Sequence, residues 1–329
     1  MRALVTGAAG FIGSHLALRL TGEGHRVVGV DSFTDYYDVA MKRARADAVA
    51  DAGASVVEAD LNTADLDELI DGVDVVFHLA GQPGIRASWG TDFLTYTRCN
   101  ISATQKLLEA TRGKAGLRRL VFASSSSVYG DAERFPTIER YRPQPVSPYG
   151  VTKLAAEHLC ALYATNFGVP SVCLRYFTVY GPGQRPDMAF ARFTEAALTG
   201  QEIVVFGSGE QVRDFTFVDD VVEATILAAT REVSAGSVLN VAGGSPSSVN
   251  DVLGILEGLV GRKLPVLRQD AVAGDMRRTG GDTAAIRSEL GWQPRIGLRD
   301  GLALQLAWAE ERRGTVPAVS GETAPMLTR

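Results

Sequence analysis

The chain has 329 residues, a formal charge of −5 and a pI near 5.5. This acidic balance argues against a surface that binds nucleic acid, although a local group of arginines can still bind an anionic ligand. Apolar residues make up 46 % and charged residues 22 % of the chain, which is ordinary for a globular protein of one large domain or two lobes.

No apolar run reaches the roughly 18 residues that a membrane-spanning helix needs, and the N-terminus has none of the features of a signal peptide. We therefore expect a cytoplasmic protein without a membrane or nucleic-acid partner. Cys99, Cys160 and Cys173 have no metal-ligand spacing and stand among apolar neighbours. No metal site is expected, and the three thiols are interpreted as buried.

Short apolar runs alternate with helical stretches through most of the chain. The runs are rich in Val and Leu, and several lack polar alternation, which is typical of strands covered on both faces of a parallel sheet. Strands are predicted at Arg2–Val5, Arg26–Val30, Ser55–Glu58, Val73–His78, Arg119–Ala123, Ser171–Arg175 and Val238–Val241. Helices are predicted at Gly13–Thr21, Thr91–Thr111 and Thr152–Asn166. This alternation predicts an α/β, Rossmann-type doubly wound parallel sheet of about seven strands.

A glycine-rich turn follows the first predicted strand. Gly7, Gly10 and Gly13 permit a tight turn, close approach of a pyrophosphate and tight packing of helix on strand. Phe11 and Ile12, within this turn, are also assigned to the cofactor site, and the free N–H groups at the start of the next helix face the anion. The spacing is G-x-x-G-x-x-G rather than G-x-G-x-x-G, which alone only suggests a dinucleotide site. Its position after an N-terminal strand favours that interpretation.

Asp31 follows the second strand, where a carboxylate can hydrogen-bond both hydroxyls of an adenosine ribose. Because a carboxylate repels the 2′-phosphate of NADP, the sequence favours NAD; the alternative is a solvated turn aspartate. The ends of the third and fourth strands fall where the adenine and a ribose would lie. The residues assigned to the cofactor site there are Asp60, Leu61, Leu79, Ala80 and Gly81.

Tyr149 and Lys153 stand four residues apart, which places both side chains on one face at the start of a helix. They follow a strand that ends in the serine run Ser124–Ser127. A phenol with a pKa of about 10 is a poor base at neutral pH. A neighbouring ammonium and a positive nicotinamide ring favour the phenolate, so Tyr149 is the candidate base for a substrate hydroxyl. The alternative is a surface Tyr and Lys beside a serine-rich turn.

With these residues the chain resembles the extended short-chain dehydrogenase/reductase family, in particular its NAD-dependent nucleotide-sugar epimerases and dehydratases. The resemblance covers residues 1 to about 310. It implies NAD as the cofactor and a catalytic triad of Ser125, Tyr149 and Lys153, the last two also contacting the cofactor. It also implies a seven-stranded dinucleotide-binding domain with a smaller C-terminal substrate lobe.

The alternation of predicted strands and helices becomes less regular after about residue 180. Gly and Pro are more frequent there and indicate functional loops. An NAD-binding domain is expected from residues 1–181 plus 233–241. A nucleotide-sugar-binding lobe is expected from residues 182–232 plus 242–313. The tail 314–329 has no periodicity and is expected to be disordered.

Ser126 and Ser127 discriminate among the reactions of the family that the chain resembles. The 4,6-dehydratases have Asp-Glu at this place, and the UDP-glucuronate decarboxylases typically have Ser-Glu. Hydroxyls alone lack the second acid–base group that those reactions require. Simple 4-epimerisation needs no second acid–base group. The hydride leaves C4, the 4-keto sugar rotates to present its other face, and the hydride returns to that face.

Several stretches resemble UDP-glucuronate 4-epimerases specifically, namely residues 31–38, 42–45, 81–86 and 178–188. Many relatives have Asn where Thr178 stands. A hydroxyl there, with Ser126 and Ser127, is interpreted as holding a hexuronate carboxylate by charge-assisted hydrogen bonds. The alternative is that these hydroxyls only satisfy backbone groups. The basic run Lys42–Arg45 is interpreted as a solvated helix face.

The remaining candidates for substrate binding are mostly arginines. Arg213 resembles the family arginine that grips the nucleotide diphosphate, and Arg185 is expected close by; solvated arginines are the alternative. Where many relatives have an Arg before a later Gly-Asp motif, this chain has Val272, so Arg277 or Arg278 is expected to substitute. The predicted substrate site is completed by Arg86, Met188 and Asp275.

The preferred interpretation is reversible 4-epimerisation of UDP-glucuronate to UDP-galacturonate with tightly held NAD. The nearest alternative is a UDP-glucose/UDP-galactose 4-epimerase, which has the same triad. A non-catalytic NAD-binding regulator is the other alternative, since fold alone does not establish catalysis, but the intact Tyr149–Lys153 pair argues against it. The resemblance also implies a homodimer in which helices 91–111 and 150–167 pair.

Overall fold

A parallel sheet of seven strands forms the centre of the computed structural model, which describes residues 1–270 and 276–315. The strand order is β11-β6-β5-β4-β1-β2-β3. The strands are β1 (Arg2–Thr6), β2 (Arg26–Asp31), β3 (Ser55–Glu58), β4 (Val75–His78), β5 (Arg119–Ser125), β6 (Ser171–Tyr176) and β11 (Ser237–Val241). Each lies where a strand is predicted, so the doubly wound α/β class is confirmed.

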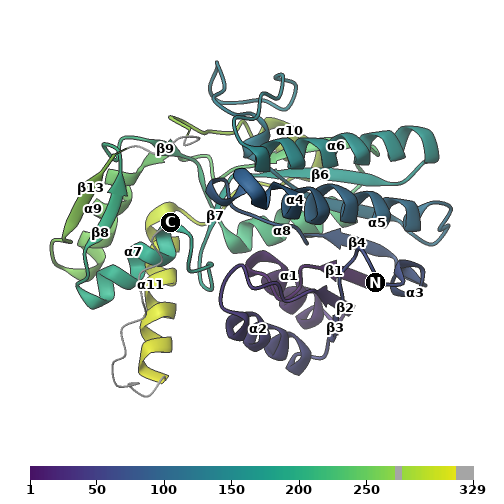
Figure 1. Ribbon diagram of the computed structural model, residues 1–329, viewed down its shortest axis with the longest axis horizontal. Helices are drawn as coiled ribbons and strands as arrows, with labels where there is room; N and C mark the ends of the chain where they lie inside the picture. The colour runs from purple at the N-terminus through teal and green to yellow at the C-terminus, as the bar shows by residue number, and fades with distance from the viewer. Residues whose placement is uncertain (271–275, 316–329) are drawn as a thin grey trace.

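Helices cover both faces of this sheet (Figure 1). On one face lie α1 (Phe11–Gly22), α2 (Val39–Asp51) and α8 (Val218–Thr230); on the other lie α3 (Leu66–Ile70), α5 (Ala103–Thr111) and α6 (Pro148–Phe167). Side chains along a strand alternate between two cores. In β1, Val5 packs in the core with Leu16, whereas Leu4 packs in the core with Leu107.

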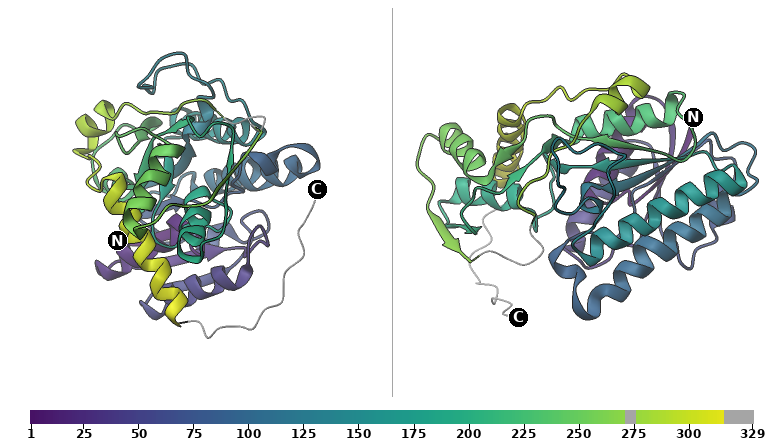
Figure 2. Two further views of the ribbon diagram at one scale, coloured as in Figure 1. Left: turned by 90° about the vertical axis from the view of Figure 1, so that its left-hand side faces the viewer. Right: turned by 90° about the horizontal axis from the view of Figure 1, so that it is seen from above.

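Two of the predicted helices differ in detail from expectation. The stretch predicted as one helix over 91–111 consists of α4 (Phe93–Tyr96), the π-helical segment η3 (Thr97–Ser102) and α5. The other, α6, begins earlier than predicted because the Ser147 side chain accepts a hydrogen bond from the Gly150 N–H at 3.1 Å and Pro148 occupies the first turn. Helices α5 and α6 lie side by side along one face (Figure 2, right).

A smaller group of elements lies beyond the carboxyl ends of the strands (Figure 1). Its two-stranded pairs are β7 with β10, β9 with β12, and β8 with β13. Their bounds are β7 (Thr178–Tyr180), β8 (Ile203–Phe206), β9 (Val212–Arg213), β10 (Phe215–Phe217), β12 (Ser247–Ser248) and β13 (Val266–Gln269). Its helices are α7 (Ala189–Thr199), α9 (Val249–Val260) and α11 (Leu298–Thr315). The helix α10 (Ala284–Leu290) lies against β11 and α8, and three short turns follow strands of the sheet: η1 (Arg86–Ser88) and η2 (Gly90–Asp92) after β4, and η4 (Ser126–Val128) after β5.

The boundary between the two predicted lobes crosses continuous packing. Residues 182–232 are predicted as part of the smaller lobe, yet α8 packs on α1, β5 and β6, and α10 packs on α8 and β11. One hydrophobic core continues from the sheet through Tyr180 and Phe190 to Leu302. The predicted tail 314–329 lies outside the described residues from 316 onward. Among the residues that the structure describes, no helix is long and apolar enough to cross a bilayer.

Candidate active site

A cleft lies at the carboxyl ends of the central strands, beside the switch in strand order between β1 and β4. Every residue predicted to contact the cofactor lines this cleft: Gly7, Gly10, Phe11, Ile12, Gly13, Asp31, Asp60, Leu61, Leu79, Ala80, Gly81, Tyr149 and Lys153. Within residues 1–270 and 276–315, no group of three His, Cys, Asp or Glu side chains is arranged to hold a metal ion.

The glycine turn leaves no room for side chains. Gly7 has a φ of +74°, and a Cβ atom there would lie 2.8 Å from the backbone nitrogen of Ala80. A Cβ atom at Gly13 would overlap the carbonyl oxygen of Gly7, so the helix approaches the turn closely. Gly10 precedes α1 without a side-chain cap, so the N–H groups of the first turn are left for an anion. This geometry fits the pyrophosphate of a dinucleotide.

Asp31 is held by the two segments that flank it. Its Oδ2 accepts a hydrogen bond from the Ala9 N–H at 3.1 Å, and its Oδ1 accepts one from the Phe33 N–H at 2.9 Å. Because each carboxylate oxygen has a further lone pair, both ribose hydroxyls can still bind. Asp60 accepts hydrogen bonds from the backbone N–H and the side chain of Asn62, which outweigh partial burial and lower the pKa of Asp60. Two carboxylates thus face the half of the cleft predicted for adenosine.

We expect Asp31→Ala to weaken NAD binding by about tenfold and to relax discrimination against NADP, because charge-assisted hydrogen bonds to the ribose and repulsion of the 2′-phosphate both disappear. Isothermal titration with the two cofactors measures both effects. Equal affinity of the unmodified protein for NAD and NADP would contradict the role given to Asp31.

The residues of the predicted triad meet at the inner end of the cleft. Lys153 is buried and donates a hydrogen bond from Nζ to the carbonyl oxygen of Ala123 at 2.9 Å. Burial lowers the pKa of Lys153 to about 8. Burial also raises the pKa of Tyr149, opposed by a hydrogen bond with Ser125 and by the charge of Arg185. The positive charge that favours the phenolate of Tyr149 therefore comes from Arg185, a role that the sequence did not assign to it.

A buried hydrogen-bond chain that has no sequence signal holds the loop after β4. The Thr104 hydroxyl donates to the Asn100 carbonyl at 2.6 Å, so it accepts from Nε2 of His78 at 2.9 Å. Nδ1 of His78 then accepts from the Thr6 hydroxyl at 2.8 Å, and Thr6 accepts from the Ala80 N–H at 3.1 Å. Burial lowers the pKa of His78 to about 3, which keeps the ring neutral. The chain links β1, β4 and α5 beneath the cofactor cleft.

Asn100, on the π-helical segment η3, is a second buried residue that sequence reasoning missed. Its Oδ1 accepts from the Gln82 N–H at 2.7 Å, and its Nδ2 donates to the Gln82 carbonyl at 3.0 Å. A Cβ atom at Gly81 would lie 2.8 Å from this Oδ1 and 3.3 Å from Nζ of Lys153.

The prediction that all three thiols are buried is wrong for Cys99, which is half-buried and lines the cleft.

The hydroxyls predicted to hold a carboxylate follow neighbouring strands. Ser126 and Ser127 are buried in η4, directly after β5. In the pairing of β5 with β6, Ser125 is opposite Tyr176, and Thr178 follows two residues later at the start of β7. The three hydroxyl side chains therefore belong to the same edge of the sheet as the triad.

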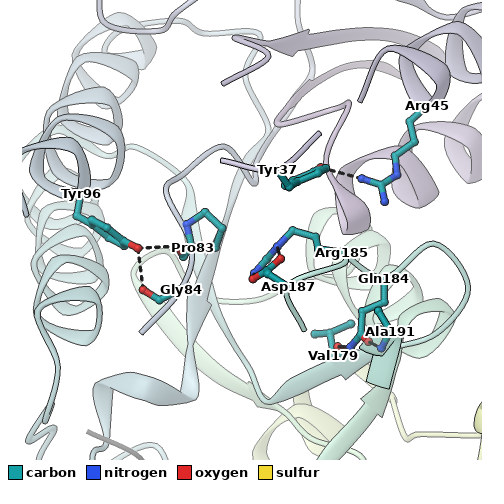
Figure 3. A network of polar contacts seen from close by, with 10 residues as sticks. All are labelled: Tyr37, Arg45, Pro83, Gly84, Tyr96, Val179, Gln184, Arg185, Asp187 and Ala191. Carbon is teal, nitrogen blue, oxygen red and sulfur yellow. Dashed lines mark hydrogen bonds and ion pairs between the residues drawn. The ribbon is translucent and has the colours of Figure 1, made fainter. Parts of the chain in front are cut away.

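The arginines of the predicted substrate site fall into separate positions. Arg185 lines the cofactor cleft and forms two hydrogen bonds of 2.9 Å with Asp187 (Figure 3). Met188 caps α7 and donates its N–H to the Arg185 carbonyl at 3.1 Å. Arg86 is exposed and stacks its guanidinium 4.4 Å from the ring centroid of Phe206.

Arg213 and Arg277 lie on paired backbone segments. The N–H of Val212 donates to the carbonyl of Arg277 at 3.0 Å, which brings β9 against the segment from 276 onward. Arg278 stacks 5.0 Å from the ring centroid of Phe135. The backbone segments that carry Arg213 and Arg277 are therefore adjacent, and neither residue is among those that line the cofactor cleft. Asp275 lies outside the described residues.

Residues 3–242 match the model of the NAD dependent epimerase/dehydratase family. The chain belongs to this family. A member from Bacillus subtilis (strain 168), named "Uncharacterized UDP-glucose epimerase YtcB", is 41 % identical over 94 % of this chain and 98 % of its own length.

Solved structures of two similar proteins share the fold and carry ligands. The UDP-glucuronic acid 4-epimerase from Bacillus cereus, in complex with UDP-glucuronic acid and NAD, is 39 % identical with a TM-score of 0.91. The alignment covers 95 % of this chain and 100 % of that one. MoeE5, in complexes with NAD and either UDP-glucuronic acid or UDP-glucose, is 43 % identical with a TM-score of 0.86, at coverages of 95 % and 100 %.

Proposed function

We propose that the protein interconverts UDP-glucuronate and UDP-galacturonate by NAD-dependent 4-epimerisation through a transient 4-keto sugar. The observation that carries this proposal is a cofactor cleft with Ser125, Tyr149 and Lys153 at its inner end and hydroxyls rather than carboxylates at Ser126 and Ser127. The likeness to the Bacillus cereus UDP-glucuronic acid 4-epimerase supports it.

Each residue of the triad has a distinct task in this proposal. NAD, when held by the residues of the cleft, would supply the acceptor for the C4 hydride. Tyr149 takes the proton of the C4 hydroxyl and later gives it back, which requires the phenolate that burial disfavours. Ser125 hydrogen-bonds the phenol, and Arg185 adds positive charge. Lys153, one turn after Tyr149 on α6, donates a hydrogen bond to the Ala123 carbonyl of β5 and would supply the ammonium at the cofactor side of the phenol.

The remaining site residues are proposed to hold the parts of the substrate that do not react. Arg213 and Arg277 would bind the diphosphate, as their adjacent backbone segments suggest, with Arg185 on the cofactor side. The diphosphate then stays fixed while the 4-keto sugar rotates between the two hydride transfers. Ser126 and Ser127 would receive the hexuronate carboxylate.

Incubation with a panel of UDP-sugars, with products identified by NMR, tests the proposal. The expected result is conversion of UDP-glucuronate to UDP-galacturonate with little UDP-4-keto-pentose. Turnover of UDP-glucose without turnover of UDP-glucuronate would instead establish a UDP-glucose 4-epimerase, which the name of the Bacillus subtilis relative favours. Bound NAD without turnover of any sugar would indicate a regulator.

We propose that the protein acts as a homodimer through α4, η3, α5 and α6. The outer surfaces of these helices expose Leu94, Val151 and Leu162, and the exposed fraction of Leu94 is 78 %. Covering such apolar side chains favours self-association. Sedimentation equilibrium tests this: a monomer at micromolar concentration would contradict the proposal.

A cytoplasmic location and the two-lobe division remain proposals as well. Fractionation of the source cells tests the location, and recovery in a membrane or secreted fraction would contradict it. Because α8 packs on the sheet, a boundary that assigns α8 to the NAD-binding domain fits the packing better than one that assigns all of residues 182–232 to the smaller lobe. Limited proteolysis tests the division, and a first cut inside α8 would contradict the revised boundary.

A further inference from the structure

The segment 32–38, between β2 and α2, forms part of the wall of the cofactor cleft. Ser32, Thr34, Tyr36 and Tyr37 all line the cleft, and the segment begins directly after Asp31. We call residues 32–38 the strap. Nothing in the proposed chemistry uses the strap, so its attachment to the rest of the protein needs another explanation.

The prediction that Lys42–Arg45 is a solvated helix face is wrong for both ends of the run. Lys42 is buried and donates from Nζ to the carbonyl oxygen and the hydroxyl of Thr34, at 2.6 and 2.9 Å. Arg45 is half-buried and donates from Nη1 to the Tyr37 hydroxyl at 2.7 Å. The side chains of Lys42 and Arg45 on α2 therefore both hydrogen-bond to the strap.

Arg45 also contacts a part of the chain far away in sequence. Its Nη2 donates to the carbonyl oxygen of Gly183 at 2.6 Å, two residues before Arg185. One guanidinium thus joins α2, the strap and the loop that carries a predicted substrate residue. Figure 3 shows Tyr37 and Arg45 hydrogen-bonded on one side of Arg185 and Asp187.

The neighbouring tyrosine of the strap is held from the opposite side. The Arg185 guanidinium lies 5.8 Å from the ring centroid of Tyr36, and Tyr36 hydrogen-bonds Asp187. A Cβ atom at Gly84 would overlap the Tyr36 hydroxyl, so this loop closes on the strap as well. The Tyr96 hydroxyl fixes the loop by donating to the carbonyl oxygens of Pro83 and Gly84, both at 2.8 Å (Figure 3).

We propose that Arg45 is a positioning residue that keeps the strap closed over the cofactor, so that NAD exchanges only when the Tyr37–Arg45–Gly183 contacts break. An epimerase returns its hydride to the sugar and has no need to exchange NAD between turnovers. Loss of reduced cofactor in mid-reaction would leave an oxidised sugar and a stalled enzyme. The inference rests on the NAD-binding part of the proposed function and not on the identity of the sugar.

The geometry predicts a kinetic effect rather than a loss of affinity. Arg45 bonds to the strap and to Gly183 and is not one of the described residues that line the cleft, so its contacts hold the strap rather than the cofactor. Breaking them speeds entry and exit of the cofactor together and changes the equilibrium constant little. A residue that holds NAD directly, such as Asp31, would change the dissociation rate and the affinity instead.

Stopped-flow fluorescence with NADH and an excess of NAD as the chase measures both rate constants on the full chain without sugar. For Arg45→Met we expect dissociation and association each to accelerate about tenfold, since charge-assisted hydrogen bonds are lost. Tyr37→Phe, a smaller change, removes one of those bonds and should give an intermediate acceleration. Arg19→Met is the control, because Arg19 is exposed on α1 and pairs with Glu23 and Glu223, which lie outside the strap; its rates should equal those of the unmodified protein.

Unchanged rates in Arg45→Met and Tyr37→Phe would overturn the proposal. Faster dissociation with unchanged association would also overturn it, because Arg45 would then hold the cofactor rather than close the strap. Absence of any NADH binding would overturn the proposed function together with this inference. If the NADH rate constants change as expected but the protein epimerises no sugar, the proposed function is contradicted and this inference is not.

Discussion

Replacement of Tyr149 by Phe should lower turnover of UDP-glucuronate by about 10²-fold or more while the substrate still binds. The phenol is the only group at the inner end of the cleft that is proposed to accept the C4 proton. Its ring has a shape that Phe preserves, including the edge-to-face contact with Tyr96 at 6.3 Å between centroids. The loss therefore reports on the proton and not on packing.

Steady-state kinetics measure the effect of this change on turnover, and a binding titration of UDP-glucuronate measures its effect on substrate affinity. Tyr163→Phe is the matched control, because Tyr163 lies on the same helix and its hydroxyl bonds to Glu109 far from the cleft. That variant should keep its turnover. Near-normal turnover of Tyr149→Phe would remove Tyr149 from the mechanism.

Replacement of Thr178 by Ala should raise the decarboxylated fraction of the product by about tenfold. Oxidation at C4 of a hexuronate makes a β-keto acid, which loses CO₂ once the bond from C5 to the carboxylate lines up with the carbonyl π system. An epimerase must therefore hold the carboxylate out of that alignment. Each good hydrogen bond to a carboxylate contributes roughly 1.5–3 kcal/mol, and 1.4 kcal/mol changes a partition tenfold.

The experiment compares UDP-glucuronate with UDP-glucose, which has no carboxylate to lose. NMR measures UDP-galacturonate and UDP-4-keto-pentose, and a carbon-labelled carboxylate measures CO₂. Thr178→Ala should cost more activity with UDP-glucuronate than with UDP-glucose. Thr178→Ser keeps the hydroxyl and should restore the partition. An unchanged product ratio in Thr178→Ala would show that the hydroxyl only satisfies local backbone groups.

The sequence alone determined the fold class and the residues around the cofactor, because these depend on local patterns. Apolar runs of strand length mark strands buried on both faces, and each predicted strand is present in the central sheet. Residues that follow parallel strands meet at one edge of the sheet, wherever they stand in the chain. That rule is sufficient to bring Gly7, Asp31 and Ala80 to one cleft.

Only the tertiary structure decided which polar side chains are buried and what they contact. Thr6, His78 and Thr104 come from three elements, and their hydrogen bonds exist because packing brings those elements together. Lys42 and Arg45 belong to a charged stretch that, by local pattern alone, suits a solvated helix. Lys42 is buried and Arg45 is half-buried because the strap and the Gly183 loop contact that helix, a long-range contact that no local periodicity records.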